Sequence, residues 1–226
     1  MPVVSRDVPL IIFNMIVGEW IRLKIKREET ARLMIISPWL SDVLFPIRNF
    51  GFNSNILDLG KHFKVSDFIR ELYILSRSKD ELIIVTLDYD SREVDYKNPK
   101  RFLNIEEQVN QARRNVTELR LLVLLSDYAR IYLHPRNHAK IYITYYGAYI
   151  GSSNYTVGGL YNNDEAGVYI PRSDPMYQQA LQLAMRIVSE NGVREVKKSE
   201  LEKRIQQYIS EYPELESMVS YVEREF

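Results

Sequence analysis

The chain has 226 residues, of which 46% are hydrophobic and 27% charged, as expected of a soluble globular protein with one large or two small domains. It contains no cysteine, which excludes disulfides, zinc–thiolate sites, iron–sulfur clusters and cysteine nucleophiles and is typical of a cytoplasmic protein. The formal net charge is zero, which removes the simplest argument for a nucleic-acid or anionic-lipid partner. Basic residues nevertheless outnumber acidic ones between Lys97 and Lys140, whereas glutamates dominate between Glu211 and Phe226. Such imbalances are more often solvated surface than a binding site.

The first predicted elements are a helix, a strand and a long loop. Residues 7–26 predict a buried helix, because Asp7 and Pro9 suit its cap and first turn. Its apolar run is too short to span a bilayer and lacks the basic leader and cleavage site of a signal peptide. Residues 31–37 predict a buried strand, and the Pro, Gly and Asn residues of 38–62 predict a loop of the kind that often rims a functional site.

Helices and strands alternate through the centre of the chain. Ser66 is expected to cap a helix, and residues 81–87 predict a second buried strand. Residues 105–116 predict a helix, and the apolar run 119–125 predicts a third strand. Four short strands are expected next, over residues 130–133, 138–144, 148–152 and 166–170. A helix is expected over residues 174–190, and helical periodicity resumes after it.

This order of elements predicts an α/β fold with a mixed β-sheet flanked by helices and with extra C-terminal helices. We expect one catalytic domain over residues 1–192, with the helix of residues 7–26 packed on it. Residues 193–226 are expected to form a helical appendage, either docked on the core or used for dimerisation.

One stretch, RNHAKIYITYYGAYIGSSNYT at residues 136–156, places polar groups two residues apart in two successive strands. Strand alternation puts the histidine and the lysine on one face, and Tyr146-Gly147 can turn the chain. A hairpin of this kind can gather four polar side chains at one edge of the sheet: His138, Lys140, Ser152 and Asn154.

These residue types suit a phosphoryl group. An imidazole acts as a nucleophile or an acid–base near neutral pH, a lysine supplies positive charge, and serine and asparagine supply neutral donors. Together they form an anion cradle that contains a nucleophile. Phosphoryl transfer needs little more than positioning and charge stabilisation, so no metal and no cofactor are expected.

The pattern H-x-K followed by G-S-x-N resembles the signature of the phospholipase D superfamily, the HKD phosphodiesterases. ISPWLSD at residues 36–42 is similar to that family's first strand and its exit. Glu165 lies where members often carry a glutamate. The resemblance covers roughly residues 30–172 and implies a phospholipase D-like fold.

The resemblance also implies a mechanism. His138 would attack phosphorus and form a phosphohistidine. Lys140 and Asn154 would hold the non-bridging oxygens, Ser152 would assist them, and Glu165 would orient an imidazole. A second histidine would protonate the leaving oxygen and later activate water. Because the chain has one convincing motif, this second histidine must come from another copy, which predicts a two-fold homodimer with one composite site.

Two features depart from the family pattern. The family's aspartate, five positions after the lysine, is Tyr145 here, and the segment from there to Gly151 is one residue shorter than usual. The aspartate generally does not touch the phosphate, whereas a shortened turn can shift Ser152 and Asn154. A second H-x-K, His62-Phe63-Lys64, starts a predicted helix without a following G-S-x-N, and we interpret it as coincidental.

Several alternatives stay open. His134 and His138 would suit a metal site on a helix, but Pro135 and the strand pattern disfavour it. Glu165 can simply pair with an arginine, and the tyrosines of the hairpin can pack against one another or stack on bases.

The preferred hypothesis is a metal-independent phosphodiesterase, namely a nuclease acting on DNA or RNA. The chain is compact, the segment around the motif is basic, and no membrane-docking element stands out. The second hypothesis is a phospholipase or phosphatidyltransferase with a membrane lipid as its substrate. The third is a catalytically weak module that binds nucleic acid or serves as a dimeric scaffold.

Overall fold

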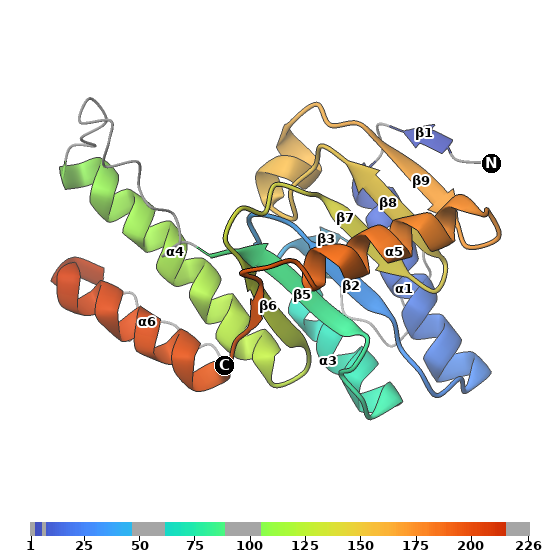
Figure 1. Ribbon diagram of the computed structural model, residues 1–226, viewed down its shortest axis with the longest axis horizontal. Helices are drawn as coiled ribbons and strands as arrows, with labels where there is room; N and C mark the ends of the chain where they lie inside the picture. Colours follow the sequence, from blue (N-terminus) through green and yellow to red (C-terminus); the bar gives the residue numbers. More distant parts are fainter. Residues whose placement is uncertain (1–2, 6–7, 47–61, 89–104, 216–226) are drawn as a thin grey trace.

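The computed structural model describes residues 3–5, 8–46, 62–88 and 105–215 of the chain. Its centre is one mixed β-sheet (Figure 1), whose strands are β1 Val3–Ser5, β2 Leu33–Ile36, β5 Leu82–Leu87, β6 Arg130–His134, β7 Ile141–Thr144, β8 Gly147–Gly151, β9 Gly167–Pro171 and β10 Arg194–Glu195. They lie side by side in the order β1-β9-β8-β7-β2-β5-β6-β10. β2, β5 and β6 are parallel to one another, and all other neighbours pair antiparallel.

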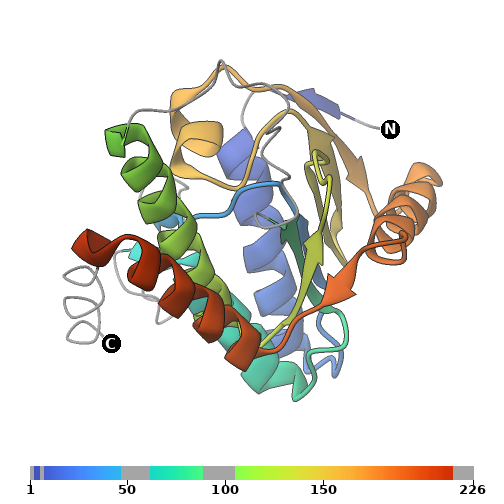
Figure 2. The same cartoon turned by 60° about the vertical axis from the view of Figure 1, so that its left-hand side comes forward.

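Helices cover both faces of this sheet, as Figure 2 shows with the sheet seen nearly edge-on. On one side lie α1 Val8–Lys26, α3 Val65–Ser76, α4 Ile105–Ser126 and α6 Lys198–Glu211. On the other side lies α5 Met176–Val188. Each side has its own core of buried apolar side chains. The predicted α/β class, with a mixed sheet flanked by helices, is confirmed.

Hydrophobic patterning explains these elements. All six residues of β5 are buried, because the strand is central and covered on both faces. A strand in this position has a nearly continuous apolar sequence. α5 buries Tyr177, Ala180, Ala184 and Ile187, whose spacing of three and four residues forms one stripe of a helix. The outward face of α5 mixes polar residues with the exposed apolar residues Met176, Leu183 and Met185.

The apolar run 119–125, which predicted a strand, is instead the end of α4. Val116, Leu119 and Leu122 are buried at intervals of three residues, so the apolar stripe of the helix continues through the run. Periodicity alone does not distinguish a short apolar strand from part of a buried helix. Because residues 105–126 contain no Gly or Pro, nothing ends the helix before this run. The third parallel strand is β6.

Two smaller predictions around α3 are also corrected. His62–Lys64 forms strand β4, which pairs with β3 Leu44–Pro46, and so does not begin a helix. α3 follows at once, with Lys64 as its N-cap. The Ser66 hydroxyl donates to Asp42 at 2.9 Å and does not cap the helix. The predicted loop 38–62 therefore contains β3, and its residues 47–61 lie outside the described part.

The C-terminal residues join the main body of the protein. β10 extends the sheet at β6, and Leu201 and Ile205 of α6 are buried in the same core as α1. The domain boundary at residue 192 stays a prediction. The last predicted helix is described only as a 3₁₀ turn, Pro213–Leu215, and residues 216–226 lie outside the described part. No helix among the described residues has the length and apolar character that crossing a membrane requires.

Candidate active site

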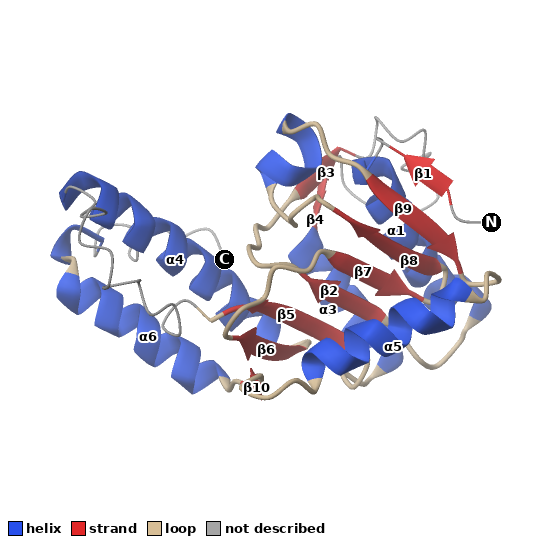
Figure 3. Cartoon of the chain, turned by 45° about the horizontal axis from the view of Figure 1, so that its top comes forward, coloured by secondary structure: helices blue, strands red, loops and turns tan. Residues whose placement is uncertain are grey.

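One edge of the sheet carries the polar residues of the motif. β2, β5, β6 and β8 end at this edge, whereas β7 and β9 begin there, and Figure 3 shows these strands side by side. The segment before β7 contains His138 and Lys140, the end of β8 leads to Ser152, and the segment before β9 contains Glu165. Strand pairing thus gathers residues that are far apart in the chain.

His138 and Lys140 lie in the segment 135–140, which crosses from β6 to β7. The strand expected over residues 138–144 begins only at Ile141, so neither residue lies within β7. The Lys140 ammonium lies 3.1 Å from His138 Nδ1 and donates to the His138 carbonyl oxygen at 2.8 Å. The Gly151 amide donates to the Lys140 carbonyl at 3.2 Å, which ties this segment to the end of β8. The side chains of His138 and Lys140 are therefore in direct contact.

The two side chains differ in exposure. His138 is exposed to solvent, whereas Lys140 is only 8% exposed. Burial lowers the pKa of Lys140, and the nearby Glu165 carboxylate partly opposes this effect by favouring the charged ammonium. Because an ammonium is only a donor, His138 Nδ1 accepts the hydrogen bond, and a neutral His138 carries its ring proton on Nε2.

Glu165 is held by two neutral side chains. The Ser152 hydroxyl donates to Glu165 Oε2, and Asn163 Nδ2 donates to Glu165 Oε1 at 3.2 Å. The Ala166 amide donates back to the Ser152 hydroxyl at 3.1 Å. Within the described residues the carboxylate makes no hydrogen bond to His138. Sequence analysis missed Asn163, although it stands only two residues before the glutamate.

Asn154 is not joined to the other predicted site residues. Its Oδ1 is buried and has no hydrogen-bond partner among the described residues. Its backbone is fixed by a tight turn, because a Cβ atom at Gly159 would lie 2.5 Å from the Asn154 carbonyl oxygen. The buried Ser153 hydroxyl donates to the Gly159 carbonyl at 2.6 Å and closes this turn. In the sequence, only the pair Gly158-Gly159 after the motif indicated that the chain turns tightly here.

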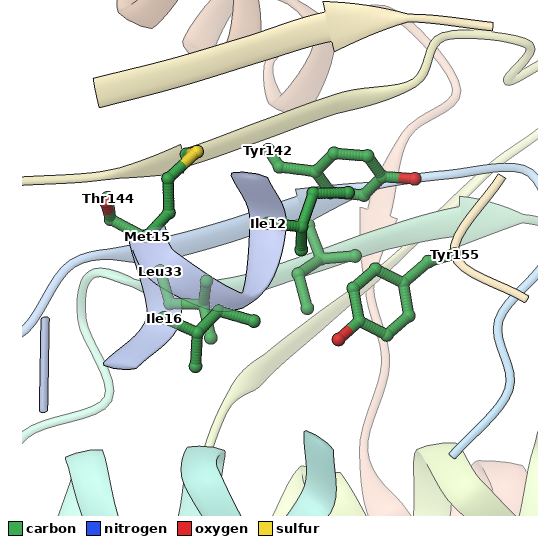
Figure 4. Close-up of a pocket in the computed structure, with 8 residues that line it drawn as sticks. Ile12, Met15, Ile16, Leu33, Tyr142, Thr144 and Tyr155 are labelled. Atoms are coloured by element: carbon green, nitrogen blue, oxygen red, sulfur yellow. The ribbon is translucent and has the colours of Figure 1, made fainter. Parts of the chain in front are cut away.

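Three tyrosines pack behind the edge. The rings of Tyr142 and Tyr149 are stacked with centroids 5.7 Å apart, and Tyr155 meets Tyr142 edge-on at 5.5 Å. Figure 4 shows Tyr142 and Tyr155 beside a narrow gap next to α1, whose other lining residues are Ile12, Met15, Ile16, Leu33, Ile35 and Thr144. All three rings are buried, so they serve packing of the hairpin and not stacking on bases.

Tyr149 lies under the ends of two strands. A Cβ atom at either Gly151 or Gly167 would lie 2.3 Å from the Tyr149 side chain, so both positions need glycine. The Tyr149 hydroxyl is buried without a hydrogen-bond partner among the described residues. Burial, with a smaller contribution from the Glu165 carboxylate, raises the pKa of Tyr149 to about 12.

His134 anchors one end of the segment that carries His138. Its Nδ1 accepts the Arg136 amide hydrogen at 2.9 Å, and its Nε2 lies 3.0 Å from Glu190 Oε2. With both ring nitrogens engaged, the imidazole of His134 supports the backbone and is not shared with His138. No group of three or more potential metal ligands is found in the described part of the chain.

Asn137 anchors the same segment at its centre. The side chain is 4% exposed, its Oδ1 accepts the Ala139 amide hydrogen at 3.0 Å, and its Nδ2 donates to the Val85 carbonyl at 3.4 Å. The segment is thereby attached to β5 beneath it. Sequence analysis assigned no role to this residue. The only signal was the residue type, because asparagine side chains often accept a hydrogen bond from the backbone amide two residues later.

Tyr145, at the position of the family's aspartate, lies at the opposite end of β7. Its ring is close to the guanidinium groups of Arg22, Arg32 and Arg172, at 4.2, 4.3 and 4.8 Å. Its amide donates to Glu19 Oε2 at 3.0 Å, and Glu19 Oε1 accepts from Arg22 at 2.6 Å. This position is therefore at the opposite end of β7 from His138 and Lys140, and α1 supplies the Glu19 carboxylate beside it.

Comparisons with known proteins give structural matches alone, since no family model and no curated protein matches the chain. The chain is similar to a phospholipase D family member, Nuc from Salmonella typhimurium, with a TM-score of 0.43 and 13% identity over 87% of this chain and 99% of that one. NucT from Helicobacter pylori gives a TM-score of 0.40 and 12% identity over 84% of this chain and 94% of that one.

A phosphatidylserine synthase from Haemophilus influenzae gives a TM-score of 0.48 and 11% identity over 96% of this chain, which spans 45% of the synthase. All three of these matches have TM-scores below 0.5 and sequence identities below 25%. They carry no argument about activity, so the function is argued from the side chains.

Proposed function

We propose that the protein is a metal-independent phosphodiesterase, and specifically a nuclease that hydrolyses DNA or RNA. The observation that carries this proposal is the contact between the Lys140 ammonium and His138 Nδ1, at the edge where Ser152 and Glu165 also meet. An exposed imidazole beside a buried cation offers a nucleophile and a positive charge to one phosphate group.

In the proposed reaction, His138 Nε2 attacks phosphorus and the bond to the leaving oxygen breaks. A second imidazole gives its proton to that oxygen. Water, deprotonated by the same imidazole, then breaks the phosphorus–nitrogen bond and releases His138. Lys140 would neutralise the non-bridging oxygens, with Asn154 and Ser152 as neutral donors after a local adjustment.

Substrate binding would also change the tautomer of His138. Attack by Nε2 needs its lone pair, whereas the contact with Lys140 places the proton of a neutral ring on that nitrogen. When the ammonium turns to a phosphate oxygen, Nδ1 is released and can hold the ring proton. Glu165, or the same residue of a second copy, would then orient the ring through Nδ1.

The second imidazole is proposed to come from another copy of the chain. Of the three histidines in the sequence, His134 is buried against Glu190 and Arg136. A two-fold homodimer that pairs the two His138 edges would supply both histidines to one site. A protein that stays monomeric at micromolar concentration in sedimentation experiments would contradict this arrangement.

The test of the function uses end-labelled single-stranded DNA in excess EDTA, with wild type and His138→Ala compared side by side. We expect cleavage by the wild type and at least a thousandfold slower cleavage by the variant. Equal cleavage by both would contradict the role of His138. Cleavage of phospholipid vesicles with no cleavage of DNA or RNA would replace the nuclease by the lipid-acting alternative.

One observation favours a second candidate, the catalytically weak binding or scaffold module. Glu165 bonds Ser152 and Asn163 and leaves the imidazole without a carboxylate partner within the described residues. Binding of single-stranded DNA by wild type and His138→Ala alike, with no turnover of any phosphodiester by either protein, would favour that module.

A further inference from the structure

We propose that Arg136 binds the phosphate next to the scissile one, and that this contact makes the site prefer a polynucleotide strand to an isolated phosphodiester. The inference rests on the proposed phosphodiesterase function and adds to it the residue that selects the substrate class.

Arg136 is close to the proposed nucleophile. It precedes His138 by two residues, and two residues of chain span at most about 7 Å. Its side chain is exposed, and among the described residues its guanidinium has no acidic partner. In contrast, Arg194 and Arg204 at the same edge both pair with Asp88, at 3.4 and 2.8 Å. Arg136 is thus a cation of this edge that structural contacts do not use.

The backbone under Arg136 is fixed on both sides. Its amide donates to His134 Nδ1, and the next residue, Asn137, is attached to Val85 of β5. His134 and Asn137 are 6% and 4% exposed, so both anchors are buried. An exposed arginine on a backbone held by buried polar groups binds a ligand with little ordering of the main chain.

The charges at the edge divide between two phosphates. Lys140 touches His138 and is available to the scissile phosphate, while Glu165 offsets part of its charge. Neither residue is left for a neighbouring phosphate. The planar guanidinium of Arg136 suits that phosphate, because its fork of donors matches two phosphate oxygens. A polynucleotide carries a phosphate on each side of the scissile bond, whereas a small phosphodiester carries none.

The experiment compares Arg136→Gln with Arg77→Gln as a matched control. Arg77 is also exposed, but it lies just before β5, at the opposite edge of the sheet. The two substrates are fluorescein-labelled oligothymidylate and bis(p-nitrophenyl) phosphate, both in excess EDTA. Binding of the oligonucleotide is followed separately by fluorescence anisotropy over a range of salt concentrations.

For Arg136→Gln we expect kcat/KM on the oligonucleotide to fall about tenfold, as for one lost charge-assisted contact. On bis(p-nitrophenyl) phosphate it should change less than twofold. The dependence of log binding constant on log salt should weaken by about 0.7, the value for one phosphate contact to a single strand. Arg77→Gln should behave like wild type in all three measurements.

An equal loss on both substrates would overturn the inference, because Arg136 would then act on the scissile phosphate or on folding. An oligonucleotide rate equal to that of Arg77→Gln would overturn it as well. If the wild type cleaves neither substrate, the phosphodiesterase function itself fails. The anisotropy still decides on Arg136 in that case, since an unchanged salt dependence contradicts the phosphate contact.

Discussion

The two ends of β7 hold their charged groups in opposite ways. At the end near Tyr145, Glu19 accepts hydrogen bonds from Arg22, from the Arg32 amide and from the Tyr145 amide, at 2.6, 2.7 and 3.0 Å. Arg32 in turn forms a two-pronged pair with Glu81, at 2.8 and 2.9 Å. The buried Arg22 and the partly buried Arg32 at this end are therefore each paired with a carboxylate.

At the other end of β7 the polar groups are less completely paired. His138 is exposed, and the guanidinium of Arg136 has no acidic partner in the described structure. Asn154 Oδ1 is buried and accepts no hydrogen bond from the described residues. Burial also lowers the pKa of Lys140, so its charged form is disfavoured there. Closed ion networks stabilise a fold, whereas incompletely paired polar groups at an edge are available to a ligand, which is why we place the function at this end.

The largest effect that tests this contrast is expected for Lys140→Met. Loss of the ammonium should lower kcat/KM for oligonucleotide cleavage by about 10²–10³, because a charge opposite the phosphate oxygens is removed. The midpoint of thermal unfolding should stay equal or rise, since burial already disfavours the charged group. A clear loss of stability together with unchanged activity would mean that Lys140 belongs to a structural network.

At the closed end, Glu19→Gln should lower the free energy of unfolding by about 3 kcal/mol, because it removes one partner of a buried ion pair. Urea denaturation measures this loss, and activity per folded molecule should not change. The matched control is Glu28→Gln, which removes the other, half-exposed partner of Arg22 and should cost less than about 1 kcal/mol. Equal costs for the two variants would contradict a buried network centred on Glu19.

Tyr145→Leu should lower the free energy of unfolding by about 2 kcal/mol, since the ring contacts three guanidinium groups. Cleavage should change less than twofold, because this position lies at the far end of β7 from His138. Tyr146→Leu, at a side chain that is 37% exposed, is the control and should have a smaller effect on stability. A large loss of activity with little loss of stability would show that the position of the family's aspartate still acts on the site.

The smallest effect is expected for Tyr149→Phe, which removes a buried hydroxyl without a partner and should stabilise the protein by about 1 kcal/mol. The pKa of Tyr149 is raised to about 12 from its ordinary value of 10.0, so the phenol ionises earlier in the unfolded chain than in the folded protein. Its titration leaves stability unchanged below pH 10.0 and lowers stability as the pH rises from there through about 12. The variant should therefore show a shallower fall in stability over that range.

Urea denaturation at pH 8, 10 and 12 measures both effects. Tyr142→Phe is the matched control, because the Tyr142 hydroxyl donates to the Ser153 carbonyl at 2.7 Å and its loss should destabilise. The same change in stability for both variants would contradict an unpaired hydroxyl at Tyr149.

Local patterns predicted the hairpin and the sheet class well. β7 and β8 follow from alternation and from a short turn, and both are properties of neighbouring residues. The run 119–125 was predicted wrongly, because a short, mostly apolar run fits a buried strand and a buried helix alike. There, the packing of α4 against α6 and the sheet decided between the two.

For the candidate site, the sequence by itself determined which chemical groups are present: one imidazole and one ammonium two residues apart, and a serine and an asparagine after the next turn. It also determined the α/β class, because apolar periodicity is local. Only the tertiary structure decided that Glu165 meets Ser152, and that His134 and Asn137 hold the segment before β7. The Glu165–Ser152 and Asn137–Val85 contacts join segments that belong to, follow or precede different strands. Their pairing depends on the register and order of the whole sheet, which no local pattern encodes.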